Sequence, residues 1–503
     1  MRGKTNKLLL NTVTSLLYQV TLVICGMIIP RLMITNYGSE VNGLVSSINQ
    51  FLQMIAFLQL GVGAVMQSSL YKPLAENDIS TLSKIMKSGG RFYRKIGYIL
   101  LVYVVILVFT YQIFVPNDYS WIYTASLIVV LSINSFAQYF FGIANSTLLL
   151  ADQKGYIYYT IQVVASIINV IGVVLLVKMN MEIQVVKGAT ALVFFISPVL
   201  LAIYVKANYN IDKSVVYTEE PIKQKWNGIS QHISAVVLDG TDVIVLSVLS
   251  TLSNVSIYNV YNMVVAGIKQ LFLVMTNGIQ SLLGELWAKK EIKKLEDTFG
   301  WFEWALHNLT VYIFANTAIL IVPFVKIYTS GVSDANYDNE IFAYLIVLAN
   351  AIHCLRLPYH VMIKAVGEYK QTQNSYLIAA IMNIFISILM VRKFGLIGVA
   401  IGTLISMIYH TLWLVLYNSK NMLKWSLRKT FYQFIIDIVC IVFVLLAISR
   451  ISLDRINYIS WIFMAIKSVV LSGSVMILVN ILAYNRNMKK LKTVIWSRIA
   501  IKI

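Results

Sequence analysis

Long apolar runs recur from one end of this chain to the other, and they limit its possible folds more than any other feature. A helix of roughly 20 apolar residues crosses the ~30 Å hydrocarbon core of a bilayer, whereas a membrane-spanning strand is a segment of about 10 residues with alternating polarity. The runs in this sequence are long and do not alternate. The pattern therefore predicts an all-α integral membrane protein with about fourteen transmembrane helices.

The expected helices follow the apolar runs and are joined by short polar segments. We place them at 11–34, 41–66, 96–115, 121–150, 157–177, 185–205, 227–250, 255–284, 303–328, 341–363, 375–391, 397–417, 431–449 and 457–484.

Composition excludes a sizeable soluble domain. Hydrophobic residues make up 58% of the 503 residues and charged residues 13%, and the mean hydropathy is +0.74. An ordinary soluble domain carries about 25% charged residues. The sequence has no Gly-rich phosphate loop, HExxH or Gly-x-Ser-x-Gly pattern, and Cys25, Cys354 and Cys440 lack the spacing of metal ligands. We expect neither an enzyme nor a bound cofactor or metal.

Most of the net charge of +19 lies in the short segments that connect the apolar runs. Cytoplasmic segments of membrane proteins are enriched in Lys and Arg. The basic residues within 72–95 and 289–294 therefore predict that both termini and the segment 285–300 are cytoplasmic. Because topology accounts for the charge, we expect no nucleic-acid partner.

An internal repeat appears when residues 165–191 are aligned with 379–405. At one constant spacing, Asn169 meets Asn383 and Gly188 meets Gly402. A weaker match pairs the turn at 43–45 with the turn at 256–258. Six helices separate the copies, and an even number gives both halves the same orientation, related by an axis along the membrane normal.

The repeat predicts two pseudo-symmetric six-helix lobes followed by a C-terminal helix pair. The N-terminal lobe is expected at 1–206 and a cytoplasmic linker at 207–226. The C-terminal lobe is expected at 227–420, and the helix pair with its basic tail at 421–503. Two such lobes would enclose the central cavity that alternating-access transporters require.

Several short motifs lie in the two halves of the chain. They are Arg31-Leu32, Tyr37-Gly38, Asn42-Gly43-Leu44, Leu60-Gly61-Val62-Gly63-Ala64, and Asp239-Gly240-Thr241-Asp242 followed by Ile257-Tyr258. Together they resemble the Wzx-type polysaccharide flippases, a family of the MOP exporter superfamily along with the lipid II flippases and the MATE drug exporters. The resemblance covers essentially the whole chain. In this family's pattern an acidic residue often precedes the glycines of the second helix, and Gln59 stands there in this chain.

The resemblance implies a flippase of the bacterial cell (inner) membrane. Such a protein moves undecaprenyl-diphosphate-linked oligosaccharide units from the cytoplasmic to the outer leaflet by alternating access, for capsule, exopolysaccharide or O-antigen synthesis. Expected partners are this lipid-linked substrate, membrane lipids, and the polymerase and glycosyltransferases of the pathway. The alternatives are a MATE-like, cation-coupled drug exporter and a non-transporting membrane component of a polysaccharide pathway.

Basic residues within the apolar runs are the first candidates for a binding site, because a charge inside the bilayer is costly and is usually functional. Lys269 lies in the middle of its run. Arg356 shares one helix face with His353 and His360, beside a kink expected at Pro358. These residues would suit a diphosphate. The alternatives are snorkelling or pairing with another helix for Lys269, and an interhelical hydrogen bond for Arg356.

Polar residues of other runs complete the candidate set. Arg31 is a candidate for substrate contact or for snorkelling, and Gln53 for binding sugar hydroxyls or for helix packing. Asp239 and Asp242 lie three residues apart on one helix face and suit coupling to a proton or sodium gradient, or the neutralisation of Lys269 or Arg356. On the last two helices, Asp437 and Lys467 are expected to form a structural ion pair.

Overall fold

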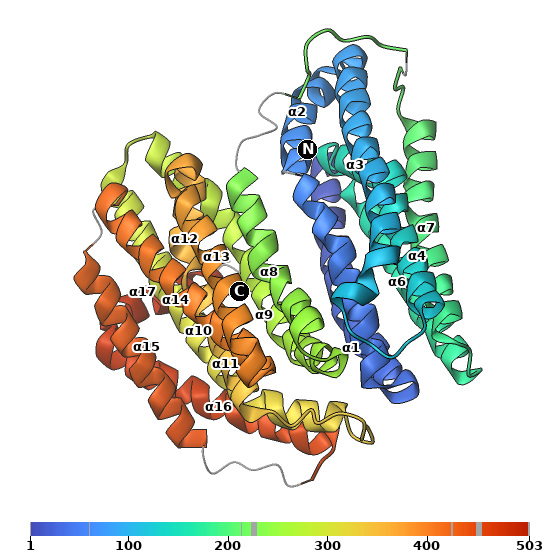
Figure 1. The fold of residues 1–503 in the computed structure, drawn as a ribbon. Helices are drawn as coiled ribbons and strands as arrows, with labels where there is room; N and C mark the ends of the chain where they lie inside the picture. The colour runs from blue at the N-terminus through green and yellow to red at the C-terminus, as the bar shows by residue number, and fades with distance from the viewer. Residues whose placement is uncertain are drawn as a thin grey trace. The chain divides into compact units, whose positions relative to one another are not determined.

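The computed structural model describes residues 2–59, 61–212, 214–222, 229–423, 426–448 and 455–500, and throughout these residues the regular structure is helical (Figure 1). The chain divides into two compact units. Unit 1 contains Met1–Asn259 and Val332–Ala335, and unit 2 contains Val260–Gly331 and Asn336–Ile503. The prediction of an all-α membrane protein is confirmed.

Unit 1 contains the helices up to the start of α9. They are α1 (Arg2–Gln53), the 3₁₀ helix η1 (Met54–Gln59), α2 (Val62–Glu76), α3 (Ile79–Phe114), α4 (Trp121–Ala137), the π-helical turn η2 (Gln138–Gly142), α5 (Ile143–Ala151), α6 (Gly155–Lys178), α7 (Ile183–Asn208), α8 (Ile229–Leu249) and the first part of α9 (Leu252–Ala288).

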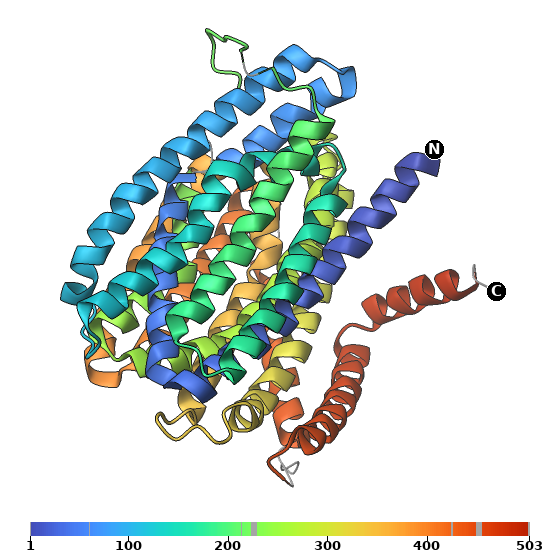
Figure 2. The ribbon, with the colours of Figure 1, turned by 90° about the vertical axis from the view of Figure 1, so that its right-hand side faces the viewer.

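Helix α1 is two helices joined at Gly38, where the backbone leaves helical geometry with φ 89° and ψ 165°. The ribbon of α1 turns back on itself there (Figure 2). Glycine adopts this positive φ without the steric cost of a side chain. The next residue, Ser39, begins the second helix, and its N–H and hydroxyl both donate to the Asp334 carboxylate, at 2.6 and 2.8 Å. The side chain of Asp334 thus caps the N-terminus of a helix that is distant in sequence.

Unit 2 contains the rest of α9 and the helices that follow. They are α10 (Ile292–Tyr328), α11 (Glu340–Leu355), α12 (Leu357–Val366), α13 (Tyr369–Phe394), α14 (Leu396–Asn421), α15 (Leu427–Ile448), α16 (Tyr458–Ala483) and α17 (Asn485–Ala500). Helix α17 occupies the basic tail, at the red end of the chain in Figure 1.

Among the described residues, twelve helices are long and apolar enough to cross a membrane. The first of these, Leu9–Gln59, contains both helices of α1, and the apolar segment Gly240–Leu249 of α8 is shorter than the others. With α1 counted as two helices and α8 added, the observed helices match the fourteen expected segments one for one. The chain is therefore a multi-pass membrane protein by helix length and composition.

The distribution of side chains also fits a lipid environment. Large apolar residues stand on the outer surface of the helices, for example Ile122 at 73% and Leu482 at 86% exposure. Polar residues such as Asn383 and His410 are buried. Helices in lipid pack through small and polar residues, because lipid competes for the apolar ones. The polar residues inside each unit are therefore the candidates for a functional site.

Two turns of unit 1 that are distant in sequence also meet. The Asn42 side chain, beside the turn at 43–45, donates to the Ser256 hydroxyl at 2.8 Å. Next to them Gly43 lies against α9, where a Cβ would stand 1.8 Å from the backbone oxygen of Leu252. Only glycine allows the two helices to approach this closely.

Candidate functional site

The junction of α11 and α12 directs one basic side chain into unit 2. Helix α11 ends at Leu355 and α12 begins at Leu357, with Pro358 in its first turn. Proline has no N–H and displaces the preceding turn, so a break at this point is expected. Arg356 lies at the break, and its side chain is only 5% exposed.

Arg356 is held by side chains from two helices. Its guanidinium donates to Nδ1 of His353 at 3.0 Å and to Nδ1 of His410 on α14, and it lies 3.7 Å from the Met407 sulfur. Arginine can only donate, so both imidazoles must accept through Nδ1. His353 and His410 are therefore neutral in this arrangement, and Arg356 carries the charge.

Further aromatic and basic residues surround this centre. Tyr376 of α13 hydrogen-bonds to His360, and its ring meets the His410 ring edge-on at a centroid distance of 4.3 Å. The charge of Lys269 acts on His353, and Lys364 and Arg356 influence each other electrostatically. We call this set the basic cluster; it comprises Lys269, His353, Arg356, His360, Lys364, Tyr376 and His410.

The structure thus brings together three of the residues that the sequence singled out, His353, Arg356 and His360, and Lys269 lies within electrostatic range of His353. Sequence reasoning missed His410, Lys364 and Tyr376. His410 carried a usable signal, since a histidine within an apolar run is unusual, but its partner was not readable from spacing along the chain. The role of the cluster in binding remains a prediction.

The other predicted site residues belong to unit 1. Arg31 is partly buried in α1, and Gln53 is exposed at the end of the same helix. Asp242 of α8 is 3% exposed and accepts a hydrogen bond from the Tyr258 hydroxyl at 3.0 Å. The side chain of Asp239 lies outside the described residues. Of the expected carboxylate pair, the structure therefore describes only the side chain of Asp242.

Two irregular helix segments meet near Gln59. Its side-chain amide donates to the Tyr139 hydroxyl at 2.8 Å, which joins the 3₁₀ helix η1 to the π-helical turn η2. Short 3₁₀ segments within helices and π-helical turns often mark functional hinges. Gln59 stands at the position that is often acidic in the family pattern, and in this chain it is a neutral, hydrogen-bonded amide.

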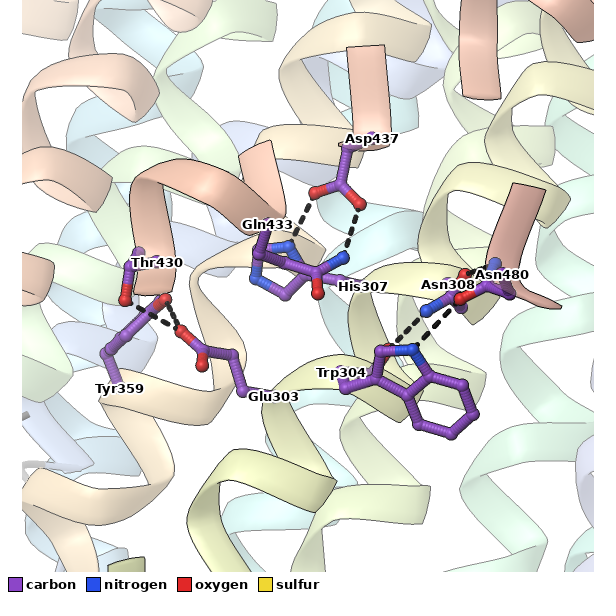
Figure 3. A network of polar contacts seen from close by, with 9 residues as sticks. All are labelled: Glu303, Trp304, His307, Asn308, Tyr359, Thr430, Gln433, Asp437 and Asn480. Atoms are coloured by element: carbon purple, nitrogen blue, oxygen red, sulfur yellow. Dashed lines mark hydrogen bonds and ion pairs between the residues drawn. The ribbon is translucent and has the colours of Figure 1, made fainter. Parts of the chain in front are cut away.

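A second polar group of unit 2 was not foreseen as a site (Figure 3). His307 of α10 contacts Asp437 of α15 at 2.6 Å, and Gln433 donates to the same carboxylate at 2.8 Å. The predicted ion pair between Asp437 and Lys467 is therefore wrong: Lys467 is exposed on α16. Two helices that are adjacent in sequence can contact each other through different faces. The sequence did not show which face of α15 carries Asp437 toward which neighbouring helix.

Comparison with known proteins adds the class of this fold. No protein-family model and no curated protein matches the sequence. The structure is similar to an inward-facing multidrug resistance MATE family transporter of the MOP superfamily, with a TM-score of 0.58 and 12% identity over 79% of this chain and 94% of that one. It is also similar to the MATE multidrug transporter DinF-BH, with a TM-score of 0.56 and 15% identity over 83% and 97%. The chain therefore has the fold of these transporters.

The likeness extends further to one particular protein. The lipid II flippase MurJ, in an inward closed conformation, superposes with a TM-score of 0.69 and 14% identity over 95% of this chain and 100% of that one. The two MATE transporters leave about a fifth of this chain unmatched, whereas MurJ leaves about a twentieth. At these identities the comparisons establish the fold alone.

Proposed function

We propose that this protein is a flippase for undecaprenyl-diphosphate-linked oligosaccharides, which it moves from the cytoplasmic to the outer leaflet by alternating access. The observation that carries the proposal is the basic cluster around Arg356 in unit 2. A diphosphate head group is anionic and needs donors inside the protein, while its polyprenyl tail can stay in lipid. Arginine suits this task because its planar fork can bind two phosphate oxygens at once.

The cluster also has the chemistry to accept and release such a ligand. His353 and His410 accept hydrogen bonds from Arg356, so an arriving phosphate could take over those donors. The displaced imidazoles could then bind sugar hydroxyls or protons. Lys269 and Lys364 add positive charge nearby, and Tyr376 offers an aromatic face and a hydroxyl for the sugar.

The fold comparison supports the same proposal. MurJ, whose name describes a lipid II flippase, matches nearly the full length of this chain, including most of the portion that the MATE structure leaves unmatched. The proposal places the protein in the bacterial inner membrane with both termini cytoplasmic. Its working partners would be membrane lipids and the glycosyltransferases and polymerase that make and use the lipid-linked unit.

A MATE-like, cation-coupled drug exporter is the second candidate. The specific observation in its favour is the set of buried carboxylates at Asp242, Glu303 and Asp437, which are 3 to 4% exposed. Carboxylates suit cationic drugs and coupling ions, whereas Arg356 opposes a cationic ligand. Export of cationic dyes by the wild-type protein, with no effect on surface polymer, would favour this candidate.

The experiment uses a strain that lacks the native gene and is complemented by each variant. We expect the Lys269→Ala, Arg356→Ala double variant to lower surface polysaccharide while lipid-linked precursor accumulates. Loss of one charge-assisted hydrogen bond costs roughly 1.5 to 3 kcal/mol, which corresponds to an affinity about tenfold to a hundredfold weaker.

The matched control is Lys467→Ala, because Lys467 is also a basic residue within an apolar helix but is exposed. This control should keep normal polymer levels. Normal surface polymer from a well-expressed Lys269→Ala, Arg356→Ala variant would refute the role of the basic cluster.

A further inference from the structure

The polar group in Figure 3 is built from two helix faces of unit 2. Glu303 and His307 lie four residues apart on α10, and Thr430, Gln433 and Asp437 follow at intervals of three and four on α15. Residues at these spacings share one face of a helix. The two faces meet in a region where Glu303, His307 and Asp437 are at most 4% exposed.

The contacts of Asp437 suit an ionised carboxylate. Its Oδ1 accepts from the Gln433 amide at 2.8 Å, and its Oδ2 lies 2.6 Å from Nδ1 of His307. An ionised carboxylate can accept on both oxygens, and His307 donates to it when Nδ1 carries a proton. A buried negative charge is costly unless a positive group pairs with it, and an imidazolium at His307 supplies that group.

A second carboxyl group completes the network. One oxygen of Glu303 accepts hydrogen bonds from the Tyr359 hydroxyl of α12 and from the Thr430 hydroxyl at 3.1 Å. Titratable groups also face the network from the neighbouring helices: Tyr359 from α12, Cys440 from α15 and Tyr484 after α16. Tyrosines and thiols are neutral near pH 7, so Glu303, His307 and Asp437 are the groups that can exchange a proton there.

A pocket connects this network with the surface of unit 2. Its volume is about 460 Å³, and Glu303 and Gln433 are among its lining residues. Charged residues from three helices also line it: Glu296 and Asp297 of α10, Lys429 of α15, and Arg486 and Lys490 of α17. A pocket of this size holds several water molecules, which can deliver protons to Glu303, one helical turn from His307.

We propose that Glu303, His307 and Asp437 form a proton-binding site that is loaded through this pocket. The proton resides on His307, where it balances Asp437, and Glu303 exchanges protons with water in the pocket. The same region connects the C-terminal helix pair, α15 and α16, with the rest of unit 2. Trp304, on the neighbouring face of α10, donates to Asn480 of α16 at 2.9 Å. This inference does not depend on which substrate the protein transports.

The test observes the proton directly. The chain has five histidines, so nitrogen NMR of the full-length protein with labelled histidine, in lipid bilayers at pH 7, can separate them. We expect an imidazolium signal that disappears in His307→Gln and becomes neutral in Asp437→Asn. His353 and His410 should give neutral signals, since both accept from Arg356. If no imidazolium signal is lost in His307→Gln, the proposal is overturned.

Glu303 is tested separately by infrared difference spectra recorded on a change of pH. Exposed carboxyl groups stay largely ionised down to about pH 5. A protonated carboxyl band that appears on mild acidification above that pH should be reduced in Glu303→Gln and unchanged in Asp297→Asn, whose side chain is exposed at the pocket. Both variants keep the size of the side chain, so the fold should be preserved. An unchanged band in Glu303→Gln would show that the pocket does not load this site.

Discussion

At the scale of single residues, the contacts of Arg356 explain more than its charge. Two imidazoles accept from one guanidinium, an arrangement that needs a planar group with several donors in fixed directions. A lysine ammonium is a compact charge on a flexible stem and does not reproduce this geometry. The identity of the side chain, as well as its charge, therefore matters at this position.

This reasoning predicts the outcome of Arg356→Lys. We expect lower thermal stability, with a loss of roughly 1 to 3 kcal/mol, because at least one buried imidazole nitrogen loses its donor. The measurement is thermal unfolding of the purified protein in detergent. Arg392→Lys, at an exposed position near the end of α13, serves as the control and should leave the unfolding temperature unchanged. Equal unfolding temperatures for the two variants would contradict the bidentate role.

At the scale of helices, close backbone contacts set how the elements pack. The contact of α1 with the start of α9 depends on Gly43, because its Cα lies almost against the Leu252 carbonyl group. The hydrogen bond between Asn42 and Ser256 lies beside the same crossing. The crossing therefore combines a small residue with a polar pair, as helix contacts in lipid commonly do.

Gly43→Ala tests this crossing. The added methyl group would stand 1.8 Å from a backbone oxygen, so the helices must move apart, at a cost of roughly 1 to 3 kcal/mol. Gly188→Ala is the control, because a Cβ at Gly188 meets nothing within 4 Å. We expect reduced yield and thermal stability for Gly43→Ala alone; a stable Gly43→Ala protein would show that the crossing is less tight in the membrane.

At the scale of the whole molecule, the length of α10 allows the membrane topology to be tested. With 37 residues it is roughly 55 Å long at 1.5 Å per residue, which exceeds the ~30 Å hydrocarbon core. Lys293 in its first turn and Ser333 in the loop after it are both exposed. They should therefore lie on opposite sides of the membrane, with Lys293 in the cytoplasm.

The measurement uses single cysteines at these two positions in a chain without its native cysteines. An impermeant thiol reagent applied to intact cells should label Ser333→Cys and not Lys293→Cys, and the pattern should reverse in inverted vesicles. Ser333 is preferred over Asp334, because Asp334 caps the helix that starts at Ser39. Labelling of both positions from one side would contradict the predicted topology.

The sequence by itself determined which segments cross the membrane. In lipid every backbone polar group needs an internal partner, so a long apolar run has to be a helix, and its position can be read locally. Within the described residues, each of the fourteen expected segments therefore contains a helix. The same local reasoning selected Lys269 and Arg356, since a charge within an apolar run is visible without a structure.

Tertiary structure alone decided which helix faces meet. Arg356 is paired with His410, 54 positions along the chain, and His307 with Asp437, 130 positions along it. The expected partner of Asp437, Lys467, is exposed on another helix face. Spacing along a sequence fixes which residues share a face of one helix. The rotation of that helix against its neighbours results from packing over the whole unit, and no single segment of sequence contains it.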